Sequence, residues 1–209
     1  MPNVETLIDQ VGHTIARITS KNKDILLSKI DLRYAYSQLR LDQKTAEHCN
    51  FSILCGPATG TYQFQTGFYG LTNMPADFQK AVDNTLVNID NIFAYLDDIL
   101  IVTENNVDIH IRKIKEVLLH LEQENLAISL HKCEFAQPEV EWLGFNITKT
   151  GTTPLVKTDA ILEIPPPKTL KDLRKFMGII HHVNRFVSNL AATCDPFREL
   201  LKGKDRNKN

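Results

Sequence analysis

The chain has 209 residues, which is enough for one domain with a sizeable core or for one and a half. Its net charge of −1 excludes a basic, nucleic-acid-binding signature over the whole chain, but from Pro165 onward six lysines and four arginines face only three aspartates and one glutamate. This basic segment is either a phosphate-binding part or a solvated tail. Neither a signal peptide nor an apolar run of the roughly 20 residues that a membrane span needs is evident, so we expect a chain that is neither secreted nor inserted in a membrane.

Hydrophobic periodicity predicts the first elements of the fold. Residues 4–15 have the spacing of an amphipathic helix, and residues 25–32 have the composition of a strand, near whose end Asp31 lies. Residues 51–64 contain strand segments that a Gly-Pro turn interrupts.

Helices and hairpins alternate in the middle of the chain. A proline in the first turn is typical of a helix, which we expect over residues 74–87. β-Branched and aromatic residues predict one hairpin over 92–102 and another within 140–148. Between them, residues 108–125 have the pattern of an amphipathic helix. Its apolar face is expected to consist of Ile111, Ile114, Val117, Leu118 and Leu121.

Three consecutive prolines at residues 165–167 predict a stiff joint between two parts of the chain, 1–164 and 165–209. A second amphipathic helical stretch is predicted after the joint, over residues 170–190. Its inward-facing residues are expected to be Leu173, Phe176, Met177 and Ile180. Because strands and helices alternate without the regular repeat of a parallel sheet, the predicted fold class is α+β.

Two adjacent aspartates, Asp97 and Asp98, lie in the middle of the most apolar run of the chain. Neighbouring carboxylates repel each other and lose hydration where their flanks are buried, so the pair needs compensation. Mg²⁺ or Mn²⁺, which prefer oxygen ligands, would supply it, whereas a tight turn with solvated aspartates is the alternative. If the segments meet in space, Asp31 would complete a carboxylate cage for two cations about 3.5–4 Å apart.

Six segments, in this order along the chain, resemble the reverse transcriptases of gypsy-type LTR retrotransposons. They are residues 31–38 (DLRYAYSQ), 69–79 (YGLTNMPADFQ), 95–98 (YLDD), 130–135 (LHKCEF), 140–145 (VEWLGF) and 165–178 (PPPKTLKDLRKFMG). The resemblance extends over nearly the whole chain. It implies a polymerase palm with partial fingers over residues 1–164, the palm being an antiparallel sheet with helices on one face. Thumb or connection helices with a polar tail are implied over residues 165–209.

The resemblance implies that Asp31, Asp97 and Asp98 are the catalytic, metal-binding carboxylates. Two Mg²⁺ or Mn²⁺ ions would act on the primer 3′-hydroxyl and on the triphosphate of an incoming dNTP. Tyr36 falls where the family has an aromatic gate against the ribose 2′-hydroxyl, and a core tyrosine is the alternative.

Further binding residues follow from the same resemblance. Nucleotide contacts are implied for Leu32, Arg33, Tyr34, Ala35, Tyr36, Tyr69, Gly70 and Lys132. The main-chain N–H groups of residues 32–36 would face the triphosphate, and Tyr69 and Gly70 would pack the incoming base. Lys132 would meet the leaving pyrophosphate, unless it is a lysine on a solvated turn.

A primer grip and a phosphate-binding surface complete the implied sites. Trp142, Leu143 and Gly144 resemble the primer grip, although core packing would also explain the single tryptophan. Phosphate contacts that are indifferent to base sequence are expected from Lys168, Lys171, Arg174, Lys175 and Arg185.

We therefore expect an RNA-directed DNA polymerase core that uses dNTPs and an RNA or DNA template with a primer. Its partners would be the protease, integrase and ribonuclease H parts of a retroelement polyprotein, in a cytoplasmic virus-like particle or in the nucleus. We expect a palm-and-thumb piece that lacks the N-terminal finger strands and the ribonuclease H domain of the family. An inactive truncated remnant that still binds nucleic acid is one alternative, and a two-cation nuclease is another.

Overall fold

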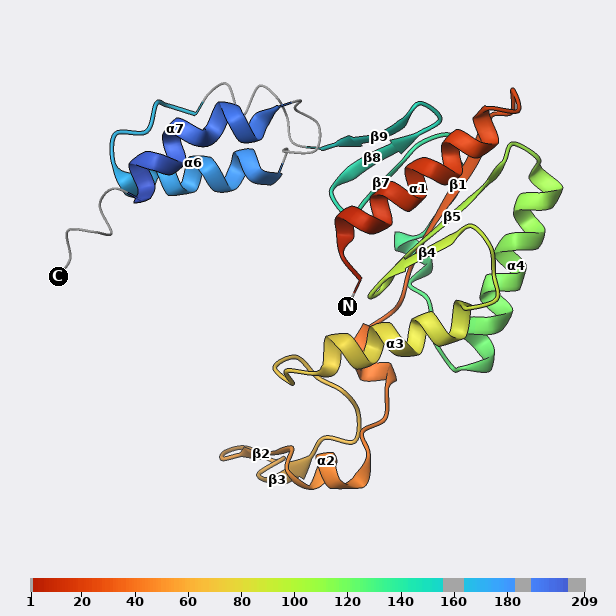
Figure 1. Cartoon of the computed structure of the whole chain (residues 1–209). Helices are drawn as coiled ribbons and strands as arrows, with labels where there is room; N and C mark the ends of the chain where they lie inside the picture. Colours follow the sequence, from red (N-terminus) through yellow and green to blue (C-terminus); the bar gives the residue numbers. More distant parts are fainter. Residues whose placement is uncertain (1, 156–163, 183–188, 203–209) are drawn as a thin grey trace. The chain divides into compact units, whose positions relative to one another are not determined.

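The structure, a computed structural model, describes residues 2–155, 164–182 and 189–202. The chain divides into two units, Met1–Thr153 and Pro154–Asn209. The first unit is built on a four-stranded sheet with the order β4-β5-β1-β6, in which each neighbouring pair is antiparallel (Figure 1). Its strands are β1 (Ile25–Asp31), β4 (Ile92–Tyr95), β5 (Asp98–Glu104) and β6 (Glu134–Gln137).

Helices cover both faces of this sheet. They are α1 (Val4–Thr19), α3 (Met74–Leu86) and α4 (Val107–Gln123). Because successive residues of a strand face opposite ways, β1 and β5 contribute to two separate cores. Leu27 and Leu100 pack with α1 on one face, whereas Ile30 and Ile99 pack with α3 and α4 on the other.

The predicted α+β class and the antiparallel sheet are confirmed. The expected restriction of helices to one face is wrong, because α1 lies on the face opposite to α3 and α4 (Figure 1). The apolar spacing in α1 predicts a helix with a buried face, but it carries no information about which side of the sheet that face covers. At its start, the side chain of Asn3 accepts the N–H of Glu5 at 2.9 Å, as an N-cap residue does.

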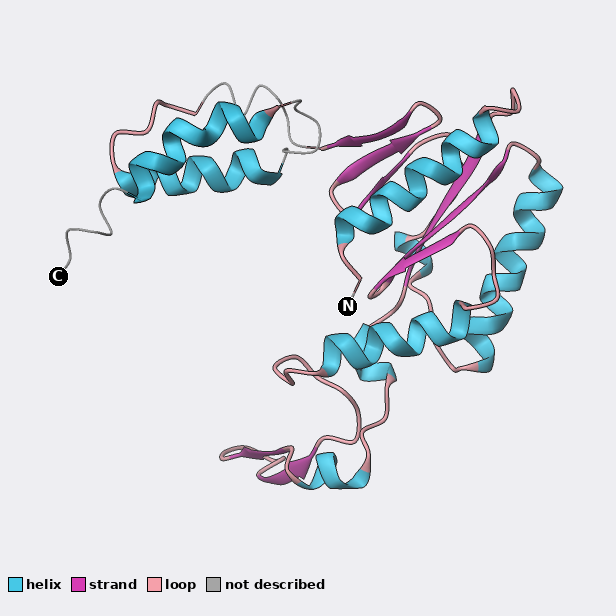
Figure 2. Ribbon diagram, viewed as in Figure 1, coloured by secondary structure: helices cyan, strands magenta, loops and turns pink. Residues whose placement is uncertain are grey.

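A second, smaller sheet confirms the strands expected over residues 51–64. It consists of β2 (Asn50–Ile53) and β3 (Gly60–Gln63), which follow the short helix α2 (Gln43–Glu47). In Figure 2 this hairpin lies away from the central sheet, to which two loops connect it. Its strands are joined by aromatic contacts, since the ring centroids of Phe51 and Tyr62 are 5.5 Å apart.

The hairpin predicted within residues 140–148 is present and belongs to a third sheet. This sheet has the order β7-β8-β9, with β7 (Val140–Trp142), β8 (Phe145–Thr148) and β9 (Gly151–Pro154). Val140 and Ile147 are buried in the same core as α1. The hairpin therefore packs on the α1 side of the central sheet.

The buried face of α4 differs from the predicted one. Ile111 is exposed, while the neighbouring His110 is fully buried together with Val117 and Leu121. Residues 110, 117 and 121 share a helical face, as the 3.6-residue period requires. The prediction used apolar residues only, so it did not include His110 in the buried face.

His110 is buried because both of its ring nitrogens are hydrogen-bonded. Nε2 lies 2.7 Å from Ser28 Oγ, and Nδ1 lies 2.7 Å from Thr103 Oγ1. Ser28 Oγ accepts the N–H of Ala136, and Thr103 Oγ1 donates to the carbonyl oxygen of Glu104. The hydroxyl of Ser28 therefore donates to Nε2 of His110, and Nδ1–H of His110 donates to Thr103 Oγ1. A ring with one donor nitrogen and one acceptor nitrogen is a neutral imidazole.

Burial lowers the pKa of His110 below its usual value. In the unfolded chain a histidine titrates at about pH 6.5, so between that pH and the lower folded pKa the unfolded state binds more protons. The stability that the neutral ring contributes is therefore complete above about pH 6.5 and is lost as the pH falls. We expect urea unfolding to show a larger loss of stability from about pH 7.5 to about pH 5.5 for the parent than for His110→Gln.

The control is His13→Gln, because His13 is exposed on α1. This variant should lose as much stability on acidification as the parent. If His110→Gln also does so, another group is responsible for the pH dependence.

The second unit contains α6 (Leu170–His182) and α7 (Leu190–Lys202). Helix α6 confirms the helical stretch predicted from residue 170 as far as His182, and residues 183–188 of that stretch lie outside the described residues. The predicted end at residue 190 is wrong, because Asn189 has a left-handed backbone with φ of 58° and Leu190 begins α7. Helix α7 was not predicted from the sequence, and it contains Pro196, a residue that is unfavourable inside a helix. Leu173 is buried as predicted, and the Phe176 ring lies 6.2 Å from that of Phe197 in α7.

Helix α6 begins with a capping box. Thr169 Oγ1 donates to Asp172 Oδ2 at 2.7 Å and accepts the N–H of Asp172 at 3.2 Å. The hydrogen bond from the Thr169 hydroxyl lowers the pKa of Asp172. No helix in the described residues is long and apolar enough to cross a membrane.

Candidate active site

The register of three strands brings the predicted carboxylates together. In the pairing of β1 with β5, Asp31 lies opposite Asp98, and in the pairing of β4 with β5, Tyr95 lies opposite Asp98. Side chains of directly opposed residues share one face, with Cβ atoms about 4.5–5.5 Å apart. Asp97 occupies the turn between β4 and β5, and its carbonyl oxygen accepts the N–H of Leu32 at 2.8 Å. All three aspartates therefore lie at one end of the sheet.

A buried glutamine of α3 holds the turn that carries Asp97. Leu96 has a left-handed backbone with φ of 52°, and its N–H donates to Gln79 Oε1 at 2.7 Å. The amide nitrogen of Gln79 donates to the carbonyl oxygen of Ala94 and to Asp83 Oδ1. Gln79 ends the 69–79 segment that resembles the family, but no role for it was predicted from the sequence, where it is a polar residue on the apolar face of a predicted helix.

The site has more negative charge than its own cations compensate. Asp31 has a side chain only 14% exposed, and its Oδ2 lies 3.4 Å from Lys132 Nζ. Its buried Oδ1 has no hydrogen-bond partner among the described residues. Burial raises the pKa of Asp98, and the charge of Asp97 raises it further, while Lys29 opposes the shift. A buried oxygen without a partner costs free energy, which a bound cation would remove.

In the part of the chain that the structure describes, no three acidic, histidine or cysteine side chains converge in a finished metal-binding geometry. The chemistry of the donor set nevertheless fits a hard cation, because carboxylate oxygens are the ligands that Mg²⁺ and Mn²⁺ prefer. Asp31, Asp97 and Asp98 are the residues that would hold such ions.

Lys29 fastens neighbouring strands to the strand that carries Asp31. The two residues are on the same face of β1, and Lys29 Nζ lies 2.7 Å from Glu134 Oε1 in β6. It also donates to the main-chain oxygen of Glu141 in β7 at 3.1 Å. The hairpin formed by β7 and β8 is thereby attached next to the carboxylates.

The residues predicted as a primer grip differ in accessibility. Trp142 is 1% exposed within the core that includes α1, and its Nε1 has no hydrogen-bond partner among the described residues. Leu143 and Gly144 form the turn between β7 and β8 with φ of 50° and 81°, and Gly144 is exposed. Only Leu143 and Gly144 are therefore open to a ligand.

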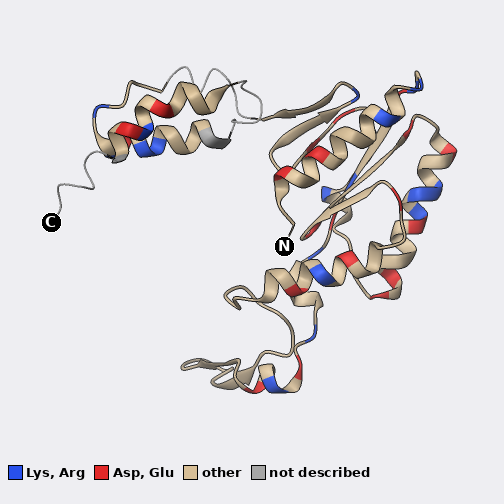
Figure 3. Cartoon of the chain, in the orientation of Figure 1, with Lys and Arg blue, Asp and Glu red and all other residues tan. Residues whose placement is uncertain are grey.

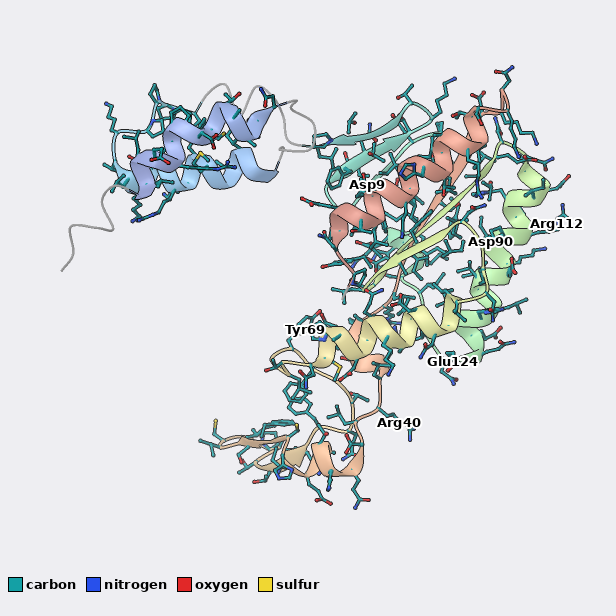
Figure 4. The ribbon with its side chains drawn as sticks, in the orientation of Figure 1. Asp9, Arg40, Tyr69, Asp90, Arg112 and Glu124 are labelled. Carbon is teal, nitrogen blue, oxygen red and sulfur yellow. The ribbon has the colours of Figure 1, made fainter. Side chains whose placement is uncertain are left out.

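Tyr36 packs against two aromatic rings. Its ring centroid is 5.2 Å from that of Tyr69 and 5.7 Å from that of Phe78. Burial, and then the negative charge of Asp97, raise the pKa of the Tyr36 hydroxyl. Tyr69, which Figure 4 labels on the loop before α3, is 82% exposed.

Two glycines shape this region. A Cβ on Gly67 would lie 2.6 Å from the main-chain oxygen of Tyr36, so only glycine fits beneath that residue. The predicted site residue Gly70 has φ of 109°, a backbone conformation that other residues rarely adopt. The sequence analysis missed Gly67, for which the sequence offers no signal.

The main-chain donors expected to face a triphosphate are only partly available. The N–H of Leu32 is bonded to Asp97, and the N–H of Arg33 donates to the carbonyl oxygen of Ala127 at 2.8 Å. Residues 34–36 lead into the 3₁₀ turn η1 (Ala35–Gln38), whose first N–H groups lack partners within the turn itself. Any main-chain contact with phosphate is thus restricted to residues 34–36.

A cavity of about 580 Å³ opens beside Asp31. One wall is formed by Asp31, Arg33 and Tyr34, and the other by residues 128–132, which include the 3₁₀ turn η2 (Leu130–Lys132). Arg33, His131 and Lys132 bring basic side chains to this cavity. It is therefore suited to an anion bound close to the carboxylates.

The predicted phosphate-binding residues lie in the second unit. Lys171, Arg174 and Lys175 are on α6, Lys168 precedes the helix, and Arg185 lies outside the described residues. Figure 3 shows basic residues of α6 gathered toward the end of the helix that follows the prolines.

Comparison with known proteins identifies the family and the fold of the chain. Residues 2–147 match the family profile described as reverse transcriptase (RNA-dependent DNA polymerase), and the chain belongs to that family. It is 32% identical over 206 residues to the Transposon Tf2-3 polyprotein and to the Transposon Tf2-7 polyprotein of Schizosaccharomyces pombe. The alignment covers 97% of this chain but 14% of each relative's length.

Solved structures of the foamy viral protease-reverse transcriptase are similar to this chain. The dRH protein in complex with ds DNA is 28% identical with a TM-score of 0.75, over 87% of this chain and 31% of that one. The protein in complex with RNA/DNA hybrid is also 28% identical, with a TM-score of 0.70 over 85% of this chain and 24% of that one. The chain thus has the fold of a reverse transcriptase polymerase.

The crowding of carboxylates should reduce stability in the absence of metal ions. Because the folded pKa of Asp98 is raised, the folded state binds a proton more tightly than the unfolded state, and stability is lost as the pH rises through that pKa. At neutral pH Asp98→Asn should therefore raise the melting temperature, by about 2–4 °C for each 1 kcal/mol gained. Added Mn²⁺ should stabilise the parent more than this variant.

A thermal melt with and without Mn²⁺ measures both effects. Asp90→Asn is the control, since Asp90 is exposed before β4 and is labelled in Figure 4. It should respond to Mn²⁺ as the parent does. An equal response of parent and Asp98→Asn would exclude Asp98 from the ion site.

Proposed function

We propose that this chain is the polymerase core of a gypsy-type retrotransposon reverse transcriptase and transfers a nucleotide from a dNTP to a primer 3′-hydroxyl by a two-metal mechanism. The observation that carries the proposal is the opposition of Asp31 and Asp98 across β1 and β5, together with the buried Asp31 Oδ1, which has no hydrogen-bond partner within the described part of the chain. Carboxylates in such a place need a cation, and the family membership makes nucleotidyl transfer the chemistry that this cation serves.

By resemblance to the family, Asp31 and Asp97 would be ligands shared by the two ions, and Asp98 would contact the ion on the primer side. When bound, the two divalent cations would lower the pKa of the primer 3′-hydroxyl and neutralise the triphosphate and the departing pyrophosphate. The hydrogen bonds of Gln79 keep the Asp97 turn in place while charge changes around it.

The surrounding residues orient the nucleotide. Tyr36, supported by Gly67 from below, crowds the ribose 2′-hydroxyl and favours deoxynucleotides. Tyr69 and Gly70 pack the incoming base against the template. Lys132, beside Asp31, meets the leaving pyrophosphate. The exposure of Tyr69 and the position of Tyr36 near Asp97 support these roles.

We assign the palm with partial fingers to residues 1–164, and the thumb or connection helices with the polar tail to residues 165–209. Leu143 and Gly144 are the part of the primer grip that touches the primer, while Trp142 supports their turn from the core. The foamy viral relatives were solved in complex with ds DNA and RNA/DNA hybrid, which supports a primer paired with an RNA or DNA template as the substrate.

The wider context is also a proposal, since the chain spans 14% of the length of its transposon relatives. Those relatives are polyproteins, so the remaining partners would be protease, integrase and ribonuclease H parts of the same polyprotein. The place of action would be a cytoplasmic virus-like particle or the nucleus.

Primer extension on an RNA template tests the function directly. With Mg²⁺ or Mn²⁺ the parent should extend the primer, and Asp97→Asn should reduce extension by a factor of at least about 10³, because it removes a metal ligand at nearly constant volume. Asp90→Asn should extend like the parent. Extension by Asp97→Asn at the parent's rate would show that the catalytic centre lies elsewhere.

A second candidate function is an inactive remnant that keeps nucleic-acid binding, and the basic face of α6 supports it. Lys171, Arg174 and Lys175 are three and four residues apart and so share one face of the helix. Absence of extension by both parent and Asp97→Asn, with retained duplex binding, would favour this candidate over the polymerase.

Phosphate binding by α6 has its own test. Changing Lys171, Arg174 and Lys175 together to glutamine should weaken duplex binding for all sequences and flatten its dependence on salt, since fewer counterions are released. The slope of log K against log salt should fall by about 1 for each lost contact. Changing Arg112, Lys113 and Lys115 of α4 to glutamine is the control, and an equal slope for both triple variants would assign no phosphate contact to α6.

A further inference from the structure

The two walls of the cavity beside Asp31 belong to segments far apart in the sequence. Backbone hydrogen bonds join them, because the N–H of Ser129 donates to the carbonyl oxygen of Asp31 at 2.8 Å and Leu32 forms an antiparallel bridge with Ile128. The same wall continues through η2 to Lys132, whose N–H donates to the carbonyl oxygen of Ser129. The width of the cavity therefore depends on how these segments are held together.

Gln38 connects both walls through its side-chain amide. Nε2 donates to the carbonyl oxygen of Arg33 at 2.5 Å and to that of Ala127 at 3.2 Å. Oε1 accepts the N–H of Ala127 at 2.6 Å. The amide thus pairs with Ala127 as a residue of a neighbouring strand would, and it also closes the turn from Arg33 to Gln38.

Because of its position, Gln38 affects the shape of the cavity in which a ligand would bind. Residues 33 and 34 form one wall of the cavity, and Ala127 precedes the wall that ends at Lys132. Tyr34 is held in the left-handed region with φ of 53°, a conformation that needs support from its surroundings. Without the amide of Gln38, the turn and the segment from Ala127 onward would keep fewer bonds to each other.

We infer that Gln38 is a positioning residue for the polyphosphate part of the nucleotide, because it fixes the cavity wall that carries Arg33 against the wall that carries Lys132. This inference rests on the proposed polymerase function and names a residue outside the groups that touch the substrate. Gln38 acts through main-chain atoms of both walls and not on the nucleotide itself.

Two variants of the full chain separate hydrogen bonding from volume. Gln38→Met keeps the length of the side chain and removes all three bonds. Gln38→Glu keeps the volume and the acceptor for Ala127 N–H, but it places a carboxylate oxygen against two carbonyl oxygens. Gln43→Met is the matched control, because Gln43 is exposed on α2 and its amide bonds only to Glu47 among the described residues.

The measurement is the affinity for Mg²⁺–dTTP in complex with a primer–template whose primer ends in a dideoxynucleotide, so that no chemistry follows. We expect Gln38→Met to weaken dTTP binding by about 5- to 20-fold, the effect of losing two or three hydrogen bonds, and Gln38→Glu to weaken it further. Affinity for the primer–template should stay within about twofold of the parent, and Gln43→Met should match the parent in both.

Unchanged dTTP affinity in both Gln38 variants would overturn the inference while leaving the polymerase function intact. So would a parent-like Gln38→Glu beside a weakened Gln38→Met, since volume would then explain the effect. If the parent chain binds no dTTP and so does not differ from Asp97→Asn, the proposed function is wrong, and the inference that rests on it is wrong too. Hydrogen exchange supplies a separate criterion, because the Ala127 amide must exchange more slowly in the parent than in Gln38→Met.

Discussion

The antiparallel register of β1 and β5 is the constraint on which the site depends. It sets Asp31 opposite Asp98, and the bond from Leu32 N–H to the Asp97 carbonyl continues the same pairing into the turn. A slip of one residue would turn each of these side chains to the other face. The apolar residues of both strands prevent such a slip, since they are buried on both faces of the sheet and every one of them would exchange cores.

The paired strands β1 and β5 carry a cluster of carboxylates that lowers the stability of the folded chain. Asp31 has a buried oxygen without a partner in the described residues, and burial raises the pKa of Asp98. Lys29 and Lys132 supply partial compensation, as both lower the pKa of Asp98. Functional sites commonly reduce stability in this way, and the deficit is the reason that such a site has affinity for a cation.

Buried or half-buried polar side chains attach the surrounding elements to the sheet. His110 joins α4 to β1 and β5, Gln79 joins α3 to the Asp97 turn, and Gln38 joins the turn after β1 to the segment before η2. Apolar packing alone would leave these elements able to shift along the sheet, because it has no preferred direction. Hydrogen bonds have such a direction, and a buried polar group that loses its partner costs free energy. These bonds therefore hold the surrounding elements in one position on the central sheet.

The sequence by itself determined the local elements, since proline, β-branched runs and apolar periods act within a few residues. It also indicated the acids of the site, because Asp97 and Asp98 stand out in an apolar run. Only the tertiary structure decided which face α1 covers, that His110 and Trp142 are buried, and that Gln79 holds the active-site turn. The physical reason is that a polar or amphipathic side chain is buried when distant segments supply its hydrogen-bond and packing partners. The periodicity of apolar residues in the sequence does not specify which segments those are.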